Sequence, residues 1–178
     1  NADYSHDEMP IYGKGAPTVL VEATTTEDVA AIVKLCYENS IPVIPRGAGT
    51  GLTGAAVALH GGVMIDMSKM NKILEYDKEN FVVRVEAGVL LNDLAEDAQK
   101  QGLLYPPDPG EKFATLGGNV STNAGGMRAV KYGCTRDYVR AMTVVLPTGE
   151  IVKLGATVSK TSTGYSLLNL MIGSEGTL

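Results

Sequence analysis

Cysteine and histidine are scarce in this 178-residue sequence, and their placement excludes two kinds of site. The two cysteines, Cys36 and Cys134, lie too far apart to match the spacing of a zinc-binding or dithiol redox motif. We expect both to be buried thiols in a protein of a reducing compartment. The only histidines are His6 and His60, and the sequence predicts no metal site.

A basic surface and a long hydrophobic run are also missing. Fifteen Lys and Arg residues against 20 Asp and Glu give a formal net charge of −5. Without a Lys/Arg cluster, the chain is a poor candidate for binding nucleic acid or an anionic membrane surface. No stretch approaches the ~18 apolar residues of a membrane span, and no signal peptide is visible. The sequence therefore predicts a cytoplasmic protein without a transmembrane segment.

Glycine, in contrast, is abundant. It accounts for 21 of the 178 residues, well above the usual ~7%. The glycines gather at residues 47–62, 117–133 and 173–176 and show no repeat period. Such clusters indicate that the backbone must approach another group closely or adopt positive φ.

The remaining pattern predicts an α+β fold. Residues 1–16 are polar, and we expect a tail or linker before a domain at 17–178. Apolar periodicity and turn residues predict a β-α-β unit followed by antiparallel pairs and helices, which is not the pattern of a doubly wound sheet. In chain order, we expect a strand at 18–23, a helix at 24–40, strands at 41–47 and 61–67, and a hairpin at 72–89. A helix at 90–102, the glycine loop at 106–133, a hairpin at 137–154 and a helix at 163–173 follow.

The stretch PRGAGTGLTG, Pro45 to Gly54, contains G-x-G-x-x-G at Gly49, Gly51 and Gly54. In a dinucleotide-binding Rossmann unit, this motif leads into a helix that returns to a parallel strand. Only AAVALHGG follows before the next predicted strand, which is too short for a parallel crossover of about a dozen residues. Successive N–H groups of the loop can still form an anion-binding concavity, with Arg46 expected at its rim. A glycine-rich turn without a ligand is the alternative.

The second glycine cluster, PPDPGEKFATLGGNVSTNAGGMRAVKYG at 106–133, is expected to be a long loop. It is too long and too rich in glycine to be an idle connection. Its centre is small and uncharged, and Asn119, Ser121, Thr122 and Asn123 supply neutral donors and acceptors. A flat uncharged ring with polar edges would match such a surface. A long surface loop with flexible tips is the alternative.

In this order, the two clusters resemble the FAD-binding domain of the vanillyl-alcohol oxidase/p-cresol methylhydroxylase (PCMH-type) flavoprotein superfamily. VVLPTGEIV and KTSTGYSLLNLMIGSEGTL also match, so the resemblance extends from about Pro17 to Leu178. The chain is most similar to the branch of glycolate oxidase D subunits and D-lactate dehydrogenase-like 2-hydroxy acid oxidoreductases. The resemblance implies two α+β subdomains, a small β-α-β unit and a mainly antiparallel sheet with flanking helices, with FAD between them.

The resemblance also implies the cofactor contacts. The FAD pyrophosphate would be wrapped by the first loop, with contributions from Pro45, Arg46, Gly47, Ala48, Gly49, Thr50, Gly51, Leu52, Thr53 and Gly54. The pyrophosphate and ribityl region would be lined by Pro107, Asp108, Thr115, Gly117, Gly118 and Asn119. The isoalloxazine ring would be approached by Ser121, Asn123, Ala124 and Gly125. The adenosine end would lie by Gly173, Glu175 and Gly176, unless Glu175 is a structural carboxylate that caps a turn.

Two positions depart from the family pattern. Thr50 aligns with a histidine that bonds covalently to the flavin in some members, so we expect non-covalent FAD. Ser166 stands where this branch often carries Asp.

The implied reaction is oxidation of a glycolate- or D-lactate-type acid by hydride transfer to flavin N5. Arg128 is a candidate contact for the substrate carboxylate, with a solvated loop arginine as the alternative; Tyr132 and Lys160 are weaker candidates for the ring region.

Family members continue past GSEGTL into a domain that caps the substrate and often carries a metal. We therefore interpret the chain as a truncated flavin domain, inactive alone, whose longer enzyme takes a small 2-hydroxy acid through the C-terminal domain. That enzyme would have partner subunits or an electron-acceptor protein or quinone, and its location would be cytoplasmic or peripheral at a membrane. A same-fold oxidase for an amine, phenol or alditol and a non-redox nucleotide-binding module remain as alternatives.

Overall fold

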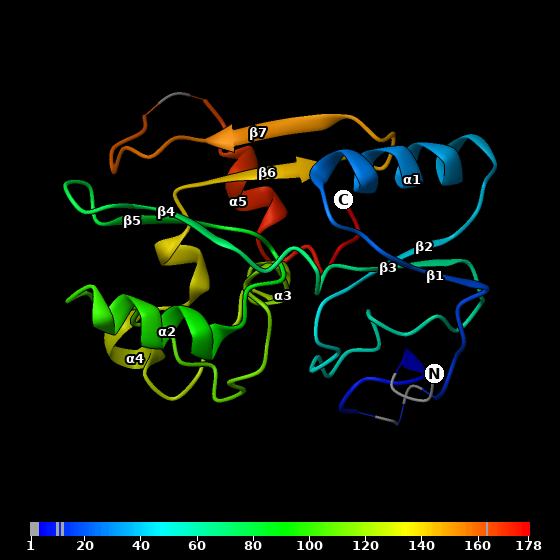
Figure 1. Ribbon diagram of the computed structural model, residues 1–178, viewed down its shortest axis with the longest axis horizontal. Helices are drawn as coiled ribbons and strands as arrows, with labels where there is room; N and C mark the ends of the chain where they lie inside the picture. Colours follow the sequence, from blue (N-terminus) through cyan, green and yellow to red (C-terminus); the bar gives the residue numbers. More distant parts are fainter. Residues whose placement is uncertain (1–3, 10, 12, 163) are drawn as a thin grey trace.

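The computed structural model describes residues 4–9, 11, 13–162 and 164–178 (Figure 1). It has a mixed α+β fold, which confirms the predicted fold class. Thr163 of the last predicted helix and parts of the predicted tail lie outside the described residues. In chain order the elements are β1 (Val19–Glu22), α1 (Thr26–Glu38), β2 (Val43–Arg46), β3 (Val63–Asp66), β4 (Ile73–Asp77), β5 (Val82–Val85), α2 (Leu91–Lys100), α3 (Leu116–Thr122), α4 (Ala129–Tyr132), the 3₁₀ helix η3 (Thr135–Tyr138), β6 (Ala141–Val145), β7 (Ile151–Gly155) and α5 (Leu167–Met171).

A three-stranded parallel sheet in the order β1-β3-β2 forms the first subdomain, and α1 packs against it (Figure 1). α1 begins with a capping box, in which the Thr25 hydroxyl accepts the Asp28 N–H at 3.0 Å and the Asp28 carboxylate accepts the Thr25 N–H. Cys36 is buried on this helix, whereas Cys134, also expected to be buried, is only partly so. The core between helix and sheet contains Ala23, Ile65 and Met70 with Val29, Ile32, Val33, Val43, Val63 and Met67.

The connection between β2 and β3 corrects one prediction. The two strands pair in parallel, with Arg46 opposite Asp66, so the judgement that a parallel crossover does not fit after Gly54 is wrong. The whole segment 47–62 makes the crossover, and counting from Gly54 understated its length. As predicted, this segment contains no helix. The Rossmann interpretation therefore still fails, because the helix on which that site depends is missing.

Two antiparallel hairpins, β4–β5 and β6–β7, form where the sequence predicted them. They make two separate two-stranded sheets in place of one mainly antiparallel sheet (Figure 1). The turn between β6 and β7 places Gly149 at φ +85°, a conformation that suits glycine. The core beside the first hairpin contains Val89, Leu91, Leu94 and Leu116 with Ile73, Val83, Val85 and Tyr105.

The second glycine cluster is not the continuous loop that the sequence predicted, because α3 and α4 form within it. Thr115 caps the start of α3 by accepting the Gly118 N–H at 3.2 Å. Asn123 ends the helix in the left-handed region at φ 49°. Adjacent glycines disfavour a helix, so these two caps and the surrounding packing outweigh local propensity here.

Residues 4–8 do not behave as the tail that the polar sequence suggested. Tyr4 packs against the small core cluster of Ile44, Ala58 and Met64. Asp7 is 3% exposed, and its carboxylate accepts the Gly54 N–H at 2.7 Å. The segment is therefore packed against the first glycine loop.

Candidate functional site

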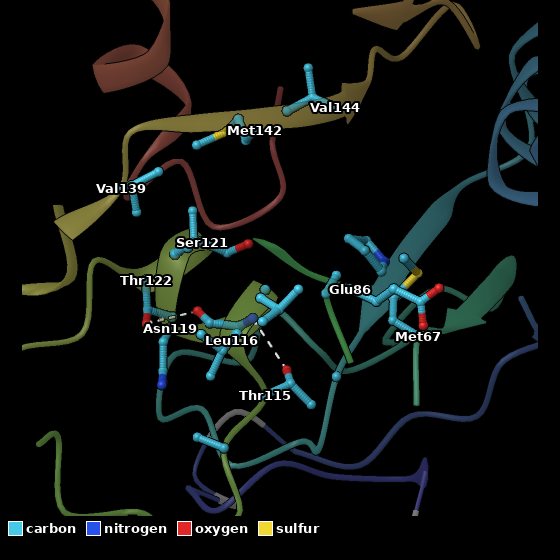
Figure 2. A pocket seen from close by; sticks show the side chains of 18 of the residues that line it. Met67, Glu86, Thr115, Leu116, Asn119, Ser121, Thr122, Val139, Met142 and Val144 are labelled. Atoms are coloured by element: carbon cyan, nitrogen blue, oxygen red, sulfur yellow. Dashed lines mark hydrogen bonds between the residues drawn. The ribbon is translucent and has the colours of Figure 1, made fainter. Parts of the chain in front are cut away.

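A cleft of about 2460 Å³ runs between the first glycine loop, α3 and the two hairpins. This volume exceeds the roughly 300–1,000 Å³ of common small-molecule pockets, so the cleft suits a long ligand. Figure 2 shows Asn119, Ser121 and Thr122 of α3 on one side of the cleft and β6, with Met142 and Val144, on the other. The two glycine clusters and the apolar side of β6 thus face one space.

The first glycine loop needs glycine for specific steric reasons. Gly49 and Gly54 have φ values of +77° and +78°. A Cβ on Gly47 would lie 2.2 Å from the Thr115 hydroxyl oxygen, and a Cβ on Gly49 would lie 2.1 Å from Nη2 of Arg46. Gly47 thus lets the two glycine clusters approach each other, and Gly49 leaves room for the arginine behind the loop.

Main-chain N–H groups of this loop are available to a ligand. Within the part of the chain that the structure describes, no hydrogen bond is donated by the N–H groups of Ala48 through Thr53. All six of these residues line the cleft. A series of unpaired N–H groups along a glycine-rich turn is an anion-binding arrangement. This arrangement suits an anionic group, and a contact of the loop with the FAD pyrophosphate stays a prediction.

Arg46 was expected at the rim of the loop, and that prediction is wrong. Its side chain is only 5% exposed. The guanidinium donates to the carbonyl oxygens of Ala56 at 2.8 Å and His6 at 3.0 Å, and it lies 5.5 Å from the ring centre of Tyr4. Arg46 therefore supports the loop from behind.

α3 brings the second cluster to the cleft. A Cβ on Gly117 would lie 2.8 Å from Cβ of Ala87, and the Gly117 N–H donates to the Ala87 carbonyl at 2.8 Å. The Thr122 hydroxyl donates to the Gly118 carbonyl at 3.1 Å (Figure 2). The first N–H groups of α3 are therefore already paired within the protein, unlike those of the first loop.

Asn119 is a polar side chain of α3 that remains available. It is 4% exposed and lines the cleft. Its carboxamide makes no hydrogen bond to any described residue. The amide can therefore donate to or accept from a ligand that enters the cleft.

The residues predicted to approach the flavin ring have mixed roles. Ser121, Asn123, Ala124 and Gly125 all line the cleft. The Asn123 side-chain oxygen accepts the Arg136 N–H at 3.0 Å, however, and the Ala124 carbonyl accepts the Thr135 hydroxyl at 2.8 Å. These two residues hold α3 against η3, whereas the Ser121 hydroxyl and the Gly125 main chain make no hydrogen bond to any described residue.

The last glycine segment ties the two clusters together. The Thr53 hydroxyl donates to the Glu175 carboxylate at 2.6 Å, and the Glu175 N–H donates to the Ser121 carbonyl at 2.8 Å. A Cβ on Gly176 would lie 2.8 Å from Cγ of Pro45. The geometry thus supports the structural role considered for Glu175, while a contact of this segment with adenosine stays a prediction.

Seven sequence-predicted residues do not line the cleft: Gly54, Pro107, Asp108, Arg128, Tyr132, Lys160 and Gly173. Arg128 lies 3.3 Å from Asp108, whose carboxylate also accepts a hydrogen bond from Lys112 at 2.7 Å. The Lys112 hydrogen bond, helped by the Arg128 charge, holds the pKa of Asp108 below its usual value. Arg128 therefore belongs to an exposed ion-pair cluster, and its proposed contact with a substrate carboxylate stays a prediction.

Sequence reasoning missed the hairpin side of the cleft. Val83 and Val85 of β5, Met142 and Val144 of β6, and Tyr105 all line it. Burial raises the pKa of Tyr105 to about 12, so its hydroxyl stays neutral near pH 7. The only sequence signal for these residues was strand alternation, which cannot separate a core face from a ligand-binding face.

Two glycine segments that converge on a long cleft between a β-α-β unit and antiparallel hairpins define a nucleotide-cofactor-binding domain. The family model described as "FAD binding domain" matches residues 17–155. The chain belongs to this family, and its cofactor is FAD.

Several proteins are similar to this chain over nearly its whole length. A D-lactate dehydrogenase of Anaerostipes hadrus is 82% identical over 178 residues, covering 100% of this chain and 38% of the relative. A glycolate oxidase subunit of Bacillus subtilis is 42% identical and covers 98% of this chain and 37% of its own length. A solved structure of an alkyldihydroxyacetonephosphate synthase superposes with a TM-score of 0.82 at 28% identity. The match covers 98% of this chain and 36% of the synthase.

The chain therefore spans little more than a third of the length of these relatives. Among the described residues, no helix is long and apolar enough to cross a membrane.

Proposed function

We propose that this chain is the flavin-binding part of a longer oxidoreductase that oxidises a 2-hydroxy acid of the D-lactate or glycolate type. The observation that carries the proposal is the 82% identity to a D-lactate dehydrogenase across all 178 residues. The glycolate oxidase subunit supports the same substrate class at 42% identity. The synthase with the same fold is only 28% identical, and a shared fold alone does not fix a reaction.

The chain's own residues would hold the cofactor through main-chain contacts. The unpaired N–H groups of Ala48 to Thr53 would bind the pyrophosphate, and the Asn119 amide would bind a polar group farther along the cofactor. FAD, when bound, supplies the redox chemistry that amino acid side chains lack. Because Thr50 has no nucleophilic ring nitrogen, we propose that the attachment is non-covalent.

The substrate would be oriented largely by residues outside this chain. No histidine is among the described residues that line the cleft. The arginine at the first loop, Arg46, is buried against carbonyl oxygens. We therefore propose that the general base and the substrate-carboxylate contact lie in the part of the relatives that this chain does not span. Partner subunits and the electron acceptor, a protein or a quinone, are proposed for the longer enzyme only.

The first experiment has two stages. The purified chain is titrated with FAD, its visible absorption band is recorded, and acid precipitation then separates bound from attached flavin. We expect binding, with the flavin released into the supernatant; yellow colour in the pellet would contradict non-covalent attachment. The longer enzyme is next assayed with D-lactate, glycolate and L-lactate and an artificial electron acceptor. Turnover of an amine or alditol but of no 2-hydroxy acid would overturn the substrate class.

A further inference from the structure

We propose that residues 4–8 form an N-terminal strap that holds the first glycine loop in its cofactor-binding form, with Asp7 as the positioning residue. The part of the proposal that concerns affinity rests on FAD binding at this loop. The strap itself is a property of the protein and can be tested without the cofactor.

Asp7 anchors the end of the glycine loop. Its side chain is 3% exposed, and both carboxylate oxygens are used: Oδ2 accepts the Gly54 N–H at 2.7 Å and Oδ1 accepts the Met9 N–H at 2.9 Å. Hydrogen bonds to an ionised acceptor are stronger than those between neutral groups. Asp7 therefore fixes the position at which the loop turns away from the cleft.

The strap also holds the middle and the start of the loop. The Glu8 N–H donates to the Gly51 carbonyl at 3.1 Å. The His6 carbonyl accepts a hydrogen bond from the Arg46 guanidinium at 3.0 Å. The space where a Gly51 Cβ would stand is open to 4 Å, so side-chain packing does not restrain this residue. The bond from Glu8 is consequently important for holding it.

The strap is in turn fixed to the parallel sheet. The Tyr4 hydroxyl donates to Oδ2 of Asp66 at 2.5 Å, and Asp66 is 2% exposed on β3. The Ser5 carbonyl accepts the Gly15 N–H at 2.9 Å. The parallel sheet is thus linked through the strap to Gly51 and Gly54 of the loop and to Arg46, which directly precedes it.

Glycine gives the loop conformational freedom that would be lost when a ligand is bound. Restraining the loop before binding removes part of that cost and raises affinity without a new contact to the ligand. The strap restrains the loop from the protein side, and both oxygens of Asp7 are already occupied there. Its role is therefore to position the loop N–H groups.

The test compares Asp7→Asn and Tyr4→Phe with a control, Glu38→Gln, which removes a carboxylate from the exposed end of α1. Hydrogen exchange of the apoprotein is measured at the amides of Glu8, Met9 and Gly54, which donate the hydrogen bonds between strap and loop, and across β1–β3. FAD affinity is measured by flavin fluorescence. For Asp7→Asn we expect exchange at Met9 and Gly54, and the dissociation constant for FAD, to rise about tenfold or more. Tyr4→Phe should give a smaller change in the same direction.

A merely structural role for Asp7 would raise exchange across the whole parallel sheet, which would contradict the proposal. Unchanged exchange at Gly54 in both variants would overturn it, even if one variant were too unstable for FAD titration. Faster loop exchange with unchanged FAD affinity would overturn the positioning role. If the unaltered protein binds no FAD, the proposed function fails, whereas local loosening of the loop in Asp7→Asn would still support the strap.

Discussion

The two glycine-rich segments that meet at the cleft differ in structure and in how they are held in place. The first, residues 47–54, has no regular structure, and its N–H groups from Ala48 to Thr53 have no partner among the described residues. The second folds into α3, and its Gly117 and Gly118 N–H groups are paired within the protein. The first segment is held by groups outside it, whereas the second is also held by its own caps at Thr115 and Asn123.

This difference indicates that glycine serves different ends in the two segments. In the first loop it leaves main-chain donors available and permits positive φ at Gly49 and Gly54. In α3 it allows close approach, since a Cβ on Gly117 would meet Ala87 at 2.8 Å. Substitutions that add one methyl group should therefore separate the two uses.

The largest effect is expected where the two segments touch. Gly47→Ala places a Cβ 2.2 Å from the Thr115 hydroxyl, and overpacking of this kind costs about 1–3 kcal/mol. We expect the free energy of unfolding of the apoprotein to fall by that amount in urea denaturation. Gly51→Ala is the matched control, because its Cβ would meet nothing within 4 Å. Equal destabilisation by both substitutions would contradict this account.

The two asparagines of the second segment should separate affinity from stability. Asn119→Ala removes an unpaired amide that lines the cleft, and we expect FAD affinity to fall roughly tenfold. Asn123→Ala removes the bond to the Arg136 N–H and puts alanine at φ 49°; we expect a loss of about 1–2 kcal/mol in stability. Thermal denaturation of the apoproteins and FAD titration should rank the two variants in opposite orders. The same order in both measurements would contradict the separate roles of the two asparagines.

A smaller effect is expected from the cap of α3. Thr115→Val removes the hydroxyl that accepts the Gly118 N–H at 3.2 Å, which should cost about 1 kcal/mol. Thr115→Ser keeps the hydroxyl and is the control. Denaturant unfolding measures both, and a Val variant as stable as the Ser variant would show that α3 does not depend on this cap.

The smallest expected effect is a loss of stability at high pH, which arises at Tyr4 of the strap behind the first loop. The hydrogen bond to Asp66, together with burial, raises the pKa of Tyr4 from 10.0 to about 12. Because the folded-state pKa is the higher one, this contribution to stability is complete below pH 10 and is lost as pH rises toward 12. Denaturation between pH 8 and pH 11.5 should therefore show a shallower decline for Tyr4→Phe than for the unaltered protein. Parallel declines would contradict a role for this hydrogen bond.

Local patterns were sufficient to predict much of the fold. The Thr25 cap, the two hairpins and the turn at Pro147 to Gly149 depend on neighbours in sequence, and each formed as expected. The glycine clusters also located the cleft. α3 was missed because its caps had to outweigh two unfavourable glycines, a balance that depends on contacts such as that between Gly117 and Ala87.

Other features depended on long-range contacts that local patterns do not reveal. The strap looks like a polar tail in the sequence, because its role depends on one buried carboxylate and on main-chain groups that bond to residues 40 or more positions away. Arg46 was placed at the rim for the same reason: its partners, Ala56 and His6, are recognisable only in the folded chain. The hairpin side of the cleft carries ordinary strand alternation and no chemical signature.

The most direct test of the central claim is an amide NMR titration of the apoprotein with FAD and, separately, with riboflavin, which lacks the pyrophosphate. We predict that FAD shifts the amide signals of Ala48 to Thr53 strongly, while riboflavin leaves them nearly unchanged and perturbs α3 instead. Loop amides that do not respond to FAD, or that respond equally to riboflavin, would contradict the assignment of this loop as the pyrophosphate site.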